Sequence, residues 1–288
     1  MKKTYKILIL IFLLPLFLSG CIKLALQLSP SLVPNLTQAL FEECDIDIAK
    51  LSIPADLKLI EGLLKSDPEN KQLLTTLCMG FTGYAMLFVE EKDPERASKL
   101  YLRARNYGFK ALGLMMYMSK NISEKDNILN KLTNINKKEL QVLFWTTISW
   151  NSWINLNLDK PVAIAQLSLA QACLEKVLDI DPYYFYGTPY TLMGSILASK
   201  PALLGGNEKK AREYFEKAIN FSDGKFFLTQ YYFAKYYAVR IQDKDLFFKL
   251  IKEVENTAPY ELKDVCLINS VMKQKTKRLM KMSGELFF

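Results

Sequence analysis

The 288-residue sequence contains no histidine. Histidine is the commonest general base in enzymes and the usual nitrogen ligand of zinc, so its absence excludes Ser-His-Asp and Cys-His catalysis and disfavours a zinc site. Paired carboxylates could still act as catalysts, but the acidic clusters at residues 42–47 and 179–181 carry no catalytic motif. We therefore expect no enzyme activity, no cofactor and no bound metal.

Glycine and proline are also scarce, with 12 and 11 residues, and strict alternation of apolar and polar residues is rare. These absences argue against strands, whereas apolar residues that recur every three or four positions predict a chain that is nearly all helix. The formal net charge is +8, and three of the lysines lie before residue 7. The remaining charge is mild, so a nucleic-acid partner is not expected.

The N-terminus has the layout of a secretory signal. Three lysines at positions 2, 3 and 6 precede an uncharged apolar run over residues 7–18, which is too short for a spanning helix. Leu18-Ser19-Gly20-Cys21 then matches the lipobox of bacterial lipoproteins. We predict that residues 1–20 are a signal peptide and that Cys21 is the lipid-bearing first residue of the mature chain. The alternative is an ordinary cleaved signal with a chance cysteine.

Lipidation would place the mature chain outside the cytoplasm, in the periplasm, anchored to the cell envelope. Bacterial lipoproteins carry a diacylglycerol thioether and usually an N-acyl chain, which together give stable anchoring. Ile22 follows the cysteine in place of the aspartate that retains some lipoproteins in the inner membrane. This favours the outer membrane over the inner one.

Four cysteines remain in the mature chain, at positions 44, 78, 173 and 266. An oxidising compartment permits disulfides, but these residues lie far apart and three of them have apolar, helix-like neighbours. We expect free, buried thiols.

Pairs of helices are indicated by a pattern of small, large and small residues at spacings of four and three, which is typical of the second helix of a tetratricopeptide unit. Asp67, Pro68 and Asn70 predict a boundary before a helix that begins near Lys71, and Asn207 is expected to cap the helix that follows it. We predict an all-α fold of degenerate tetratricopeptide-like helix pairs, stacked into one compact domain over residues 21–288 with a short N-terminal tether. The segments that carry the pattern are Ala97/Tyr101/Ala104, Ala170/Leu174/Val177, Ala211/Phe215/Ala218 and, more weakly, Phe247/Ile251/Val254.

The order of several short motifs along the mature chain resembles the T component of tripartite ATP-independent periplasmic (TRAP) transporters. Together with the lipobox, the motifs cover essentially the whole mature chain. They are Asp67-Pro68-Glu69-Asn70, Gly83-Tyr84-Ala85, Glu95-Arg96-Ala97, Phe144-Trp145 with Trp150, Tyr186-Gly187, Gly194-Ser195, the segment from Pro201 to Gly206, and Tyr237-Ala238-Val239.

The resemblance implies a lipoprotein of cryptic tetratricopeptide-like helix pairs that assembles as a homotrimer. It further implies docking of the soluble substrate-binding P component and shelter for a small, hydrophobic ligand. A structural scaffold lipoprotein of the envelope, which would bind peptides or assembly partners in a concave face, is the alternative function.

Residues 144–158 contain all three tryptophans of the chain. Trp145, Trp150, Asn151 and Trp153 are candidate walls of a ligand cavity, because large rings beside small polar groups suit an apolar ligand with a polar head. The competing interpretation is a buried core helix whose hydroxyls bond to its own backbone. Family members often place alanine or glycine near residues 151–157, so the details of such a cavity would differ in this chain.

Tyr183, Tyr184, Tyr186 and Tyr190 cluster where two helices are expected to connect. Exposed tyrosines commonly contact partner proteins, which makes these residues a candidate docking surface. Tyrosine also fills grooves between repeats, so internal packing is an equal alternative. The loop at residues 201–207 could likewise be a docking loop or a plain connection.

Charged residues have two open interpretations as well. We expect an arginine among Arg96, Arg103 and Arg105 to pair with a nearby acid at position 90, 91 or 93, and the alternative is an anchor for a ligand carboxylate. The basic stretch at residues 273–281 is expected to form a solvated helix face, and attraction to anionic lipid is the alternative.

Overall fold

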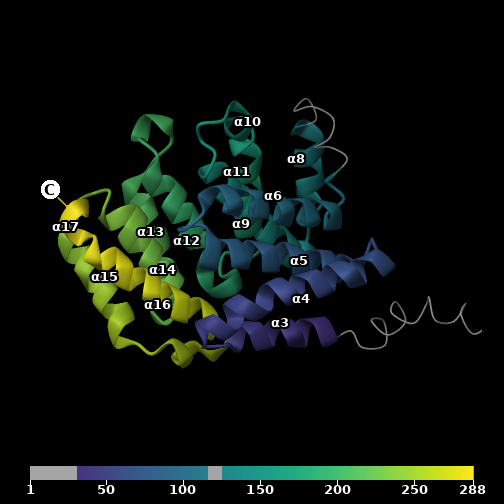
Figure 1. Ribbon diagram of the computed structural model, residues 1–288. Helices are drawn as coiled ribbons and strands as arrows, with labels where there is room; N and C mark the ends of the chain where they lie inside the picture. The colour runs from purple at the N-terminus through teal and green to yellow at the C-terminus, as the bar shows by residue number, and fades with distance from the viewer. Residues whose placement is uncertain (1–30, 116–124, 288) are drawn as a thin grey trace, which may run out of the picture.

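The computed structural model describes residues 31–115 and 125–287. The predicted signal peptide and Cys21 lie outside these residues. The described parts contain helices and no strand, which confirms the all-α prediction (Figure 1). The elements of the first half are α3 (Leu32–Glu42), α4 (Ile46–Ser66), α5 (Lys71–Tyr84), η1 (Ala85–Val89), α6 (Pro94–Ala111), α8 (Lys125–Thr133), η3 (Lys137–Glu139) and α9 (Leu140–Asn155).

The second half continues the array of antiparallel helices (Figure 1). Its elements are α10 (Pro161–Ile164), α11 (Leu167–Ile180), α12 (Tyr184–Ser199), η4 (Ala202–Leu204), α13 (Glu208–Phe221), α14 (Phe227–Tyr232), η5 (Phe233–Ala238), α15 (Lys244–Asn256), η6 (Pro259–Val265), α16 (Cys266–Lys281) and α17 (Ser283–Leu286).

The four segments with the small-large-small pattern all form the second helix of a pair. α5 packs against α6, α9 against α11, α12 against α13, and η5 against α15. All twelve residues of the four patterns are buried. The predicted helix pairs are therefore confirmed, because small residues at these spacings let neighbouring helices approach closely.

The helix boundaries follow local capping chemistry. The side chains of Asn70 and Asn207 accept hydrogen bonds from backbone N–H groups in the first turns of α5 and α13. This confirms the predicted cap at Asn207 and the predicted helix boundary at Asn70. Asp93 and Asp243 cap α6 and α15 in the same way. Polar side chains thus satisfy amides that have no partner within their own helix.

Two helix pairs share an irregular feature that the sequence does not reveal. In each pair the first helix widens into a π-helical segment, η1 or η5, just before the turn to the second helix. The wide turns are closed by hydrogen bonds from Glu90 N to Ala85 O and from Val239 N to Ala234 O. These corresponding bonds indicate that the two pairs are variants of one structural unit.

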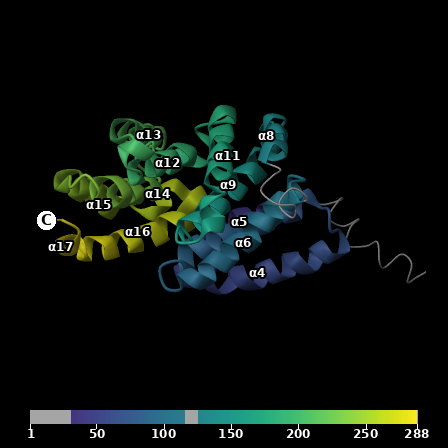
Figure 2. The same ribbon diagram turned by 90° about the horizontal axis from the view of Figure 1, so that it is seen from above.

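Helix α16, the last long helix of the chain, connects the two halves through its contacts. It lies beside α14 and α15 of the second half (Figure 2). It also contacts α3, α4 and η1 of the first half. The segment Lys71–Val89 is apolar and long enough to cross a membrane, but 67% of its most apolar stretch is buried inside the protein. We therefore assign α5 and η1 to the core of the helical array.

A disulfide joins Cys44 to Cys266, 222 positions away, with their Cα atoms 5.1 Å apart. The expectation that these two cysteines are free thiols was wrong, because α16 returns to the connection between α3 and α4. Cys78 and Cys173 are free and buried, as predicted. The wide separation of Cys44 and Cys266 in sequence therefore gave no indication that they are in contact.

Candidate functional site

Helix α3 lies between two hollows on the first half of the protein. On one side it forms an apolar groove with α4, α5 and α16, which encloses about 340 Å³. On the other side it borders a polar cleft of about 440 Å³ with α5, η3 and α9. Thr37, Phe41, Thr76 and Met79 line both hollows, so a small movement of α3 would alter both.

The apolar groove is built from helices that carry apolar residues on more than one face. Ile53 and Leu57 of α4 are buried and line the groove, and Ile48 and Leu59 on the same helix also line it while remaining 56% and 61% exposed. Leu36 of α3, 52% exposed, also lines the groove. A groove with this lining suits an apolar ligand, because such ligand sites are mainly apolar concavities of roughly 300–1,000 Å³.

Sequence reasoning missed the residues that α3 and α4 contribute to this groove. The signal was present in α4, where Ile48, Leu51 and Leu59 fall on different faces from Ala49, Ile53 and Leu57. A helix with one buried face needs only one apolar stripe. The second stripe marks a surface that the pairing of α4 with α5 does not cover.

Trp145 is the one candidate tryptophan that lines the apolar groove. Its ring is only 2% exposed and packs against Phe144, Phe185 and Phe41, with ring centroids 5.1, 5.3 and 6.4 Å away. These contacts hold the Trp145 ring in place as part of the groove wall. A role for Trp145 in ligand binding stays a prediction.

Trp150, Asn151 and Trp153 lie elsewhere on α9 and do not line the apolar groove. Trp150 is fully buried and donates a hydrogen bond from Nε1 to Oε1 of Gln166 at 2.9 Å. Asn151 donates to the carbonyl oxygens of Thr147 and Ala170 and so links α9 to α11. The structure therefore separates these three residues from Trp145, and their role in ligand binding stays a prediction.

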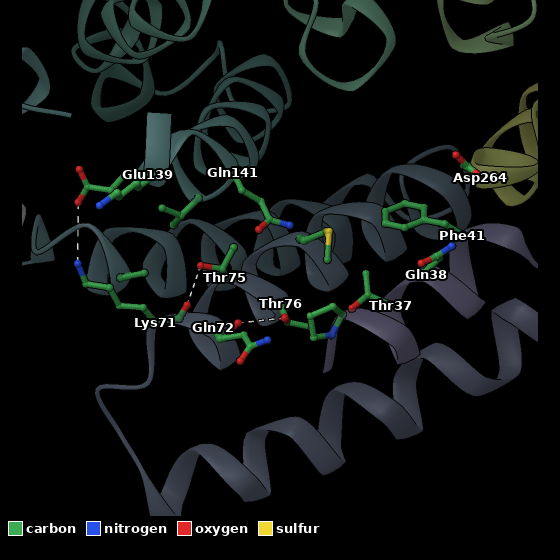
Figure 3. A pocket seen from close by; sticks show the side chains of 15 residues that line it. Thr37, Gln38, Phe41, Lys71, Gln72, Thr75, Thr76, Glu139, Gln141 and Asp264 are labelled. Atoms are coloured by element: carbon green, nitrogen blue, oxygen red, sulfur yellow. Dashed lines mark hydrogen bonds and ion pairs between the residues drawn. The ribbon is translucent and has the colours of Figure 1, made fainter. Parts of the chain in front are cut away.

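The polar cleft presents hydroxyl and amide groups along its length (Figure 3). At one end, Nζ of Lys71 lies 3.9 Å from the Glu139 carboxylate. Thr75 and Thr76 donate their hydroxyl protons to carbonyl oxygens of their own helix, so these hydroxyl oxygens face the cleft as acceptors. Both signs of charge are present, and the cleft therefore has no strong preference for an anion or a cation.

The tyrosine cluster divides between the interior and the surface. Tyr184 packs edge-on against Phe144, and burial raises the pKa of its phenol to about 12. Tyr186 donates a hydrogen bond to Asp264. Tyr183 is 42% exposed and stacks on Phe221, itself 51% exposed, while its other neighbour is Tyr190. Tyr183 is the one exposed member of these four tyrosines, and docking of a partner through the cluster stays a prediction.

The first turn of α12 is not helical: it holds three consecutive residues in the left-handed region, with φ of 46° at Phe185, 59° at Tyr186 and 75° at Gly187. A Cβ on Gly187 would lie 3.1 Å from the backbone of Ala218, so a side chain there would push α12 from α13. Left-handed non-glycine residues are uncommon and persist only where surrounding contacts fix them. Phe185 has such contacts, because its ring packs on Trp145 at the groove wall.

The expected pairing of an arginine with residue 90, 91 or 93 was wrong. Arg103 forms an ion pair with Glu61 of α4 instead. Glu91 pairs with Lys275 and Arg278 of α16, and Glu90 accepts a hydrogen bond from Tyr101. The basic stretch is thus only partly solvated, because tertiary packing brings α16 to the turn that follows η1.

A family model described as the TRAP transporter T-component matches residues 42–287. The chain belongs to this family. A similar protein, an uncharacterized protein of Treponema pallidum (strain Nichols), is 25% identical to this T component over 199 residues. The aligned region covers 63% of this chain and 62% of that protein, so the chain spans less than two thirds of the relative's length.

Members of this family are accessory components of TRAP transporters and are in general associated with the periplasm and the cell envelope. The family is a transporter family and is not known for enzyme activity. Within residues 31–115 and 125–287, no group of three or more acidic or cysteine side chains is arranged to hold a metal ion.

Proposed function

We propose that this T component is a membrane-tethered periplasmic subunit that binds the substrate-binding P component and holds a small hydrophobic ligand in the apolar groove. Family membership over residues 42–287 is the observation that carries this proposal. Tethering through Cys21, in the outer membrane, would raise the local concentration of the P component near its transporter. Assembly as a homotrimer is part of the same proposal.

The apolar groove supports the ligand part of the proposal. Exposed apolar side chains that line one continuous hollow are uncommon on a protein surface unless they bind something. Leu36, Ile48 and Leu59 lie at its rim, and Trp145 lies at its wall. A hydrophobic ligand would remove this surface from water, which is favourable in proportion to the apolar area covered.

A space-filling substitution tests the groove. Gly83 lines it, and a Cβ at this position has no neighbouring atom within 4 Å. Gly83→Leu is therefore expected to fill the groove without breaking the fold and to weaken binding of the apolar probe 1-anilinonaphthalene-8-sulfonate at least about tenfold. Gly62→Leu on α4 is the matched control, since Gly62 has equal space and does not line the groove. Equal binding by both variants would contradict the ligand proposal.

The exposed aromatic edge of α12 and α13 supports docking of the P component. Tyr183 and Phe221 stack with ring centroids 4.7 Å apart and are both partly exposed, as is typical of anchors in protein interfaces. Replacing both by alanine should weaken binding of the P component by at least about tenfold in calorimetry. Tyr260→Ala, at a tyrosine that is 69% exposed on η6, is the control and should leave the affinity unchanged.

The tether and the trimer have separate tests. Cys21→Ala should move the protein from the membrane fraction to the soluble periplasmic fraction, and mass spectrometry of the purified protein should show loss of the acyl chains. Light scattering should give three times the mass of one chain. A monomer at micromolar concentration, with no binding to the P component, would contradict the proposed assembly.

A further inference from the structure

The outer side of α4 carries a continuous stripe of exposed apolar residues. Leu51 is 78% exposed, and Ile48, Ala55 and Leu59 are exposed as well. Spacings of three and four positions place all four residues on one side of the helix. The other side of α4 is buried and packs on α5, so packing within the described residues does not account for this stripe.

Helix α3 adds a second stripe beside the first. Leu32 and Leu36 are 49% and 52% exposed, and Ala39 on the same side is exposed too. Leu36 and Ala39 line the same apolar groove as Ile48 and Leu59, so the two stripes flank one hollow along the lower edge of the molecule (Figure 1). We call this surface the α3–α4 face, and it consists of Leu32, Leu36, Ala39, Ile48, Leu51, Ala55 and Leu59.

Positive charge borders the α3–α4 face. One edge of the stripe on α4 carries three exposed lysines at spacings of eight and seven positions, Lys50, Lys58 and Lys65. The acids on this edge are Asp47 and Glu61, and Glu61 pairs with both Lys58 and Arg103. The edge therefore keeps a positive charge. An exposed apolar stripe with lysines beside it is typical of helices that lie in the surface of a membrane.

The distance from Cys21 to α3 is short. Ser31, the first described residue, lies ten positions after Cys21, so even a fully extended chain between them spans only about 35 Å. Leu32, at the start of α3, is therefore the part of the α3–α4 face nearest to the anchor along the chain. If Cys21 carries lipid, the exposed apolar surface of α3 and α4 is held within reach of the bilayer.

We propose that the α3–α4 face lies on the bilayer that holds the lipid anchor. Its apolar side chains would enter the boundary between headgroups and acyl chains, and Lys50, Lys58 and Lys65 would lie beside anionic headgroups. The inference rests on the proposed tether at Cys21 and assigns the side of the protein that meets the membrane. Helix α10 lies at the opposite edge and would face away (Figure 1). The apolar groove would then open towards the lipid.

Vesicle binding by the mature chain with Cys21→Ala tests the face apart from the tether. The probe is a vesicle of phosphatidylethanolamine with about a quarter phosphatidylglycerol, and bound protein is measured by sedimentation. We expect weak, reversible, saturable binding with a Kd below about 1 mM accessible lipid, which washing of cell membranes would disrupt. Absence of such binding would overturn the proposal. Mass spectrometry of wild type reads acylation of Cys21 separately, so failure of the tether and failure of the face are distinguishable.

Paired aspartate substitutions assign the binding to the face. Leu32 and Leu51 belong to the face but do not line the groove. Leu32→Asp with Leu51→Asp should weaken vesicle binding at least about tenfold and leave binding of the apolar probe unchanged. Val162→Asp with Leu203→Asp is the matched control, because these residues are 52% and 98% exposed on α10 and η4 and the charge change is the same. Equal vesicle binding by the two double variants would overturn the proposal.

The same face variant separates the membrane from a second copy of the chain. Light scattering without vesicles should give the same mass for wild type and for Leu32→Asp with Leu51→Asp. A variant that becomes monomeric and still binds vesicles as wild type does would assign the face to contacts between copies and overturn the membrane proposal.

Lysine substitutions test the basic edge. Lys50→Gln with Lys65→Gln should weaken binding to the anionic vesicles at least about fivefold, since each lysine near such a surface contributes to the attraction. Lys209→Gln with Lys210→Gln removes the same charge from exposed positions on α13 and should have little effect. Equal weakening by both double variants would show attraction through net charge alone and overturn the role of this edge.

Discussion

Nζ of Lys275 lies 3.1 Å from the carboxylate of Glu91, although the two residues are separated by most of the chain. Lys275 is almost completely buried and also donates a hydrogen bond to the carbonyl oxygen of Met86, which belongs to the π-helical segment η1. Arg278 reaches the same carboxylate at 2.8 Å. This cluster fixes α16 across the first half of the protein and so joins the two ends of the helical array.

Replacing Glu91 tests the importance of this cluster for stability. Glu91→Gln would leave Lys275 buried without its counter-ion, and we expect a loss of about 1–3 kcal/mol in the free energy of unfolding, moderated by the partial exposure of Glu91. Glu95→Gln is the matched control, because its pair with Lys99 is highly exposed. Denaturant titration measures the free energy of unfolding of the two variants and of wild type. An equal, small effect of the two substitutions would show that α16 is held by apolar packing alone.

The same carboxylate predicts a dependence of stability on pH. Burial by itself would raise the pKa of Glu91, but Lys275 and Arg278 outweigh it and hold the pKa below the ordinary 4.5. The folded protein therefore binds this proton less tightly than the unfolded chain, so the ionised carboxylate stabilises the fold above pH 4.5. This contribution is lost as the pH falls through the lowered pKa. The stability difference between wild type and Glu91→Gln should be constant near pH 7 and shrink below about pH 4.

Thiol labelling tests the disulfide between Cys44 and Cys266. Before reduction, no cysteine of the described residues should react with a maleimide, because Cys78 and Cys173 are buried and burial raises the pKa of each thiol to about 12. Mild reduction without denaturant should release Cys44 for labelling, while Cys78 and Cys173 stay unreactive. Labelling of Cys44 in the unreduced protein would contradict the bond.

Loss of the disulfide should also loosen α3. Cys44→Ser with Cys266→Ser is expected to lower the free energy of unfolding by about 2–4 kcal/mol, since the bond closes a long loop in the unfolded chain. Because α3 borders both hollows and buries only Val33 fully, its hydrogen exchange should rise more than that of α5. Uniform exchange changes in both helices would show that the bond stabilises the whole fold without a special effect on α3.

Two glycine substitutions test the close approach of α6 to α9. A Cβ on Gly108 would lie 2.0 Å from Oγ1 of Thr146, so Gly108→Ala must push the helices apart and should cost about 1–3 kcal/mol. Gly62→Ala is the control, because the same substitution in open space on α4 should stabilise the helix by about 0.5–1 kcal/mol. Thermal unfolding measures both variants: Gly108→Ala should unfold at a lower temperature than wild type, and Gly62→Ala at a higher one.

Local patterns predicted the secondary structure and the helix pairing well. The small-large-small segments identified α6, α11, α13 and α15, because residues at these spacings share one helix face whatever the rest of the fold does. Asn70 and Asn207 likewise predicted the starts of α5 and α13, since capping depends on atoms three residues apart. The order of short motifs indicated the TRAP T-component family, and the family match confirmed it.

Contacts between distant segments could not be predicted in this way. The tryptophans of α9 lie close together in sequence, yet of the three only Trp145 lines the apolar groove, because helical rotation and the position of α3 decide which side each ring faces. From the sequence alone, the periodicity of apolar residues determined that the chain is helical. The absence of histidine determined that the commonest catalytic base is missing. Only the return of α16 decided that Cys44 meets Cys266 and that Glu91 meets Lys275, since both pairs form through packing of segments that no local pattern connects.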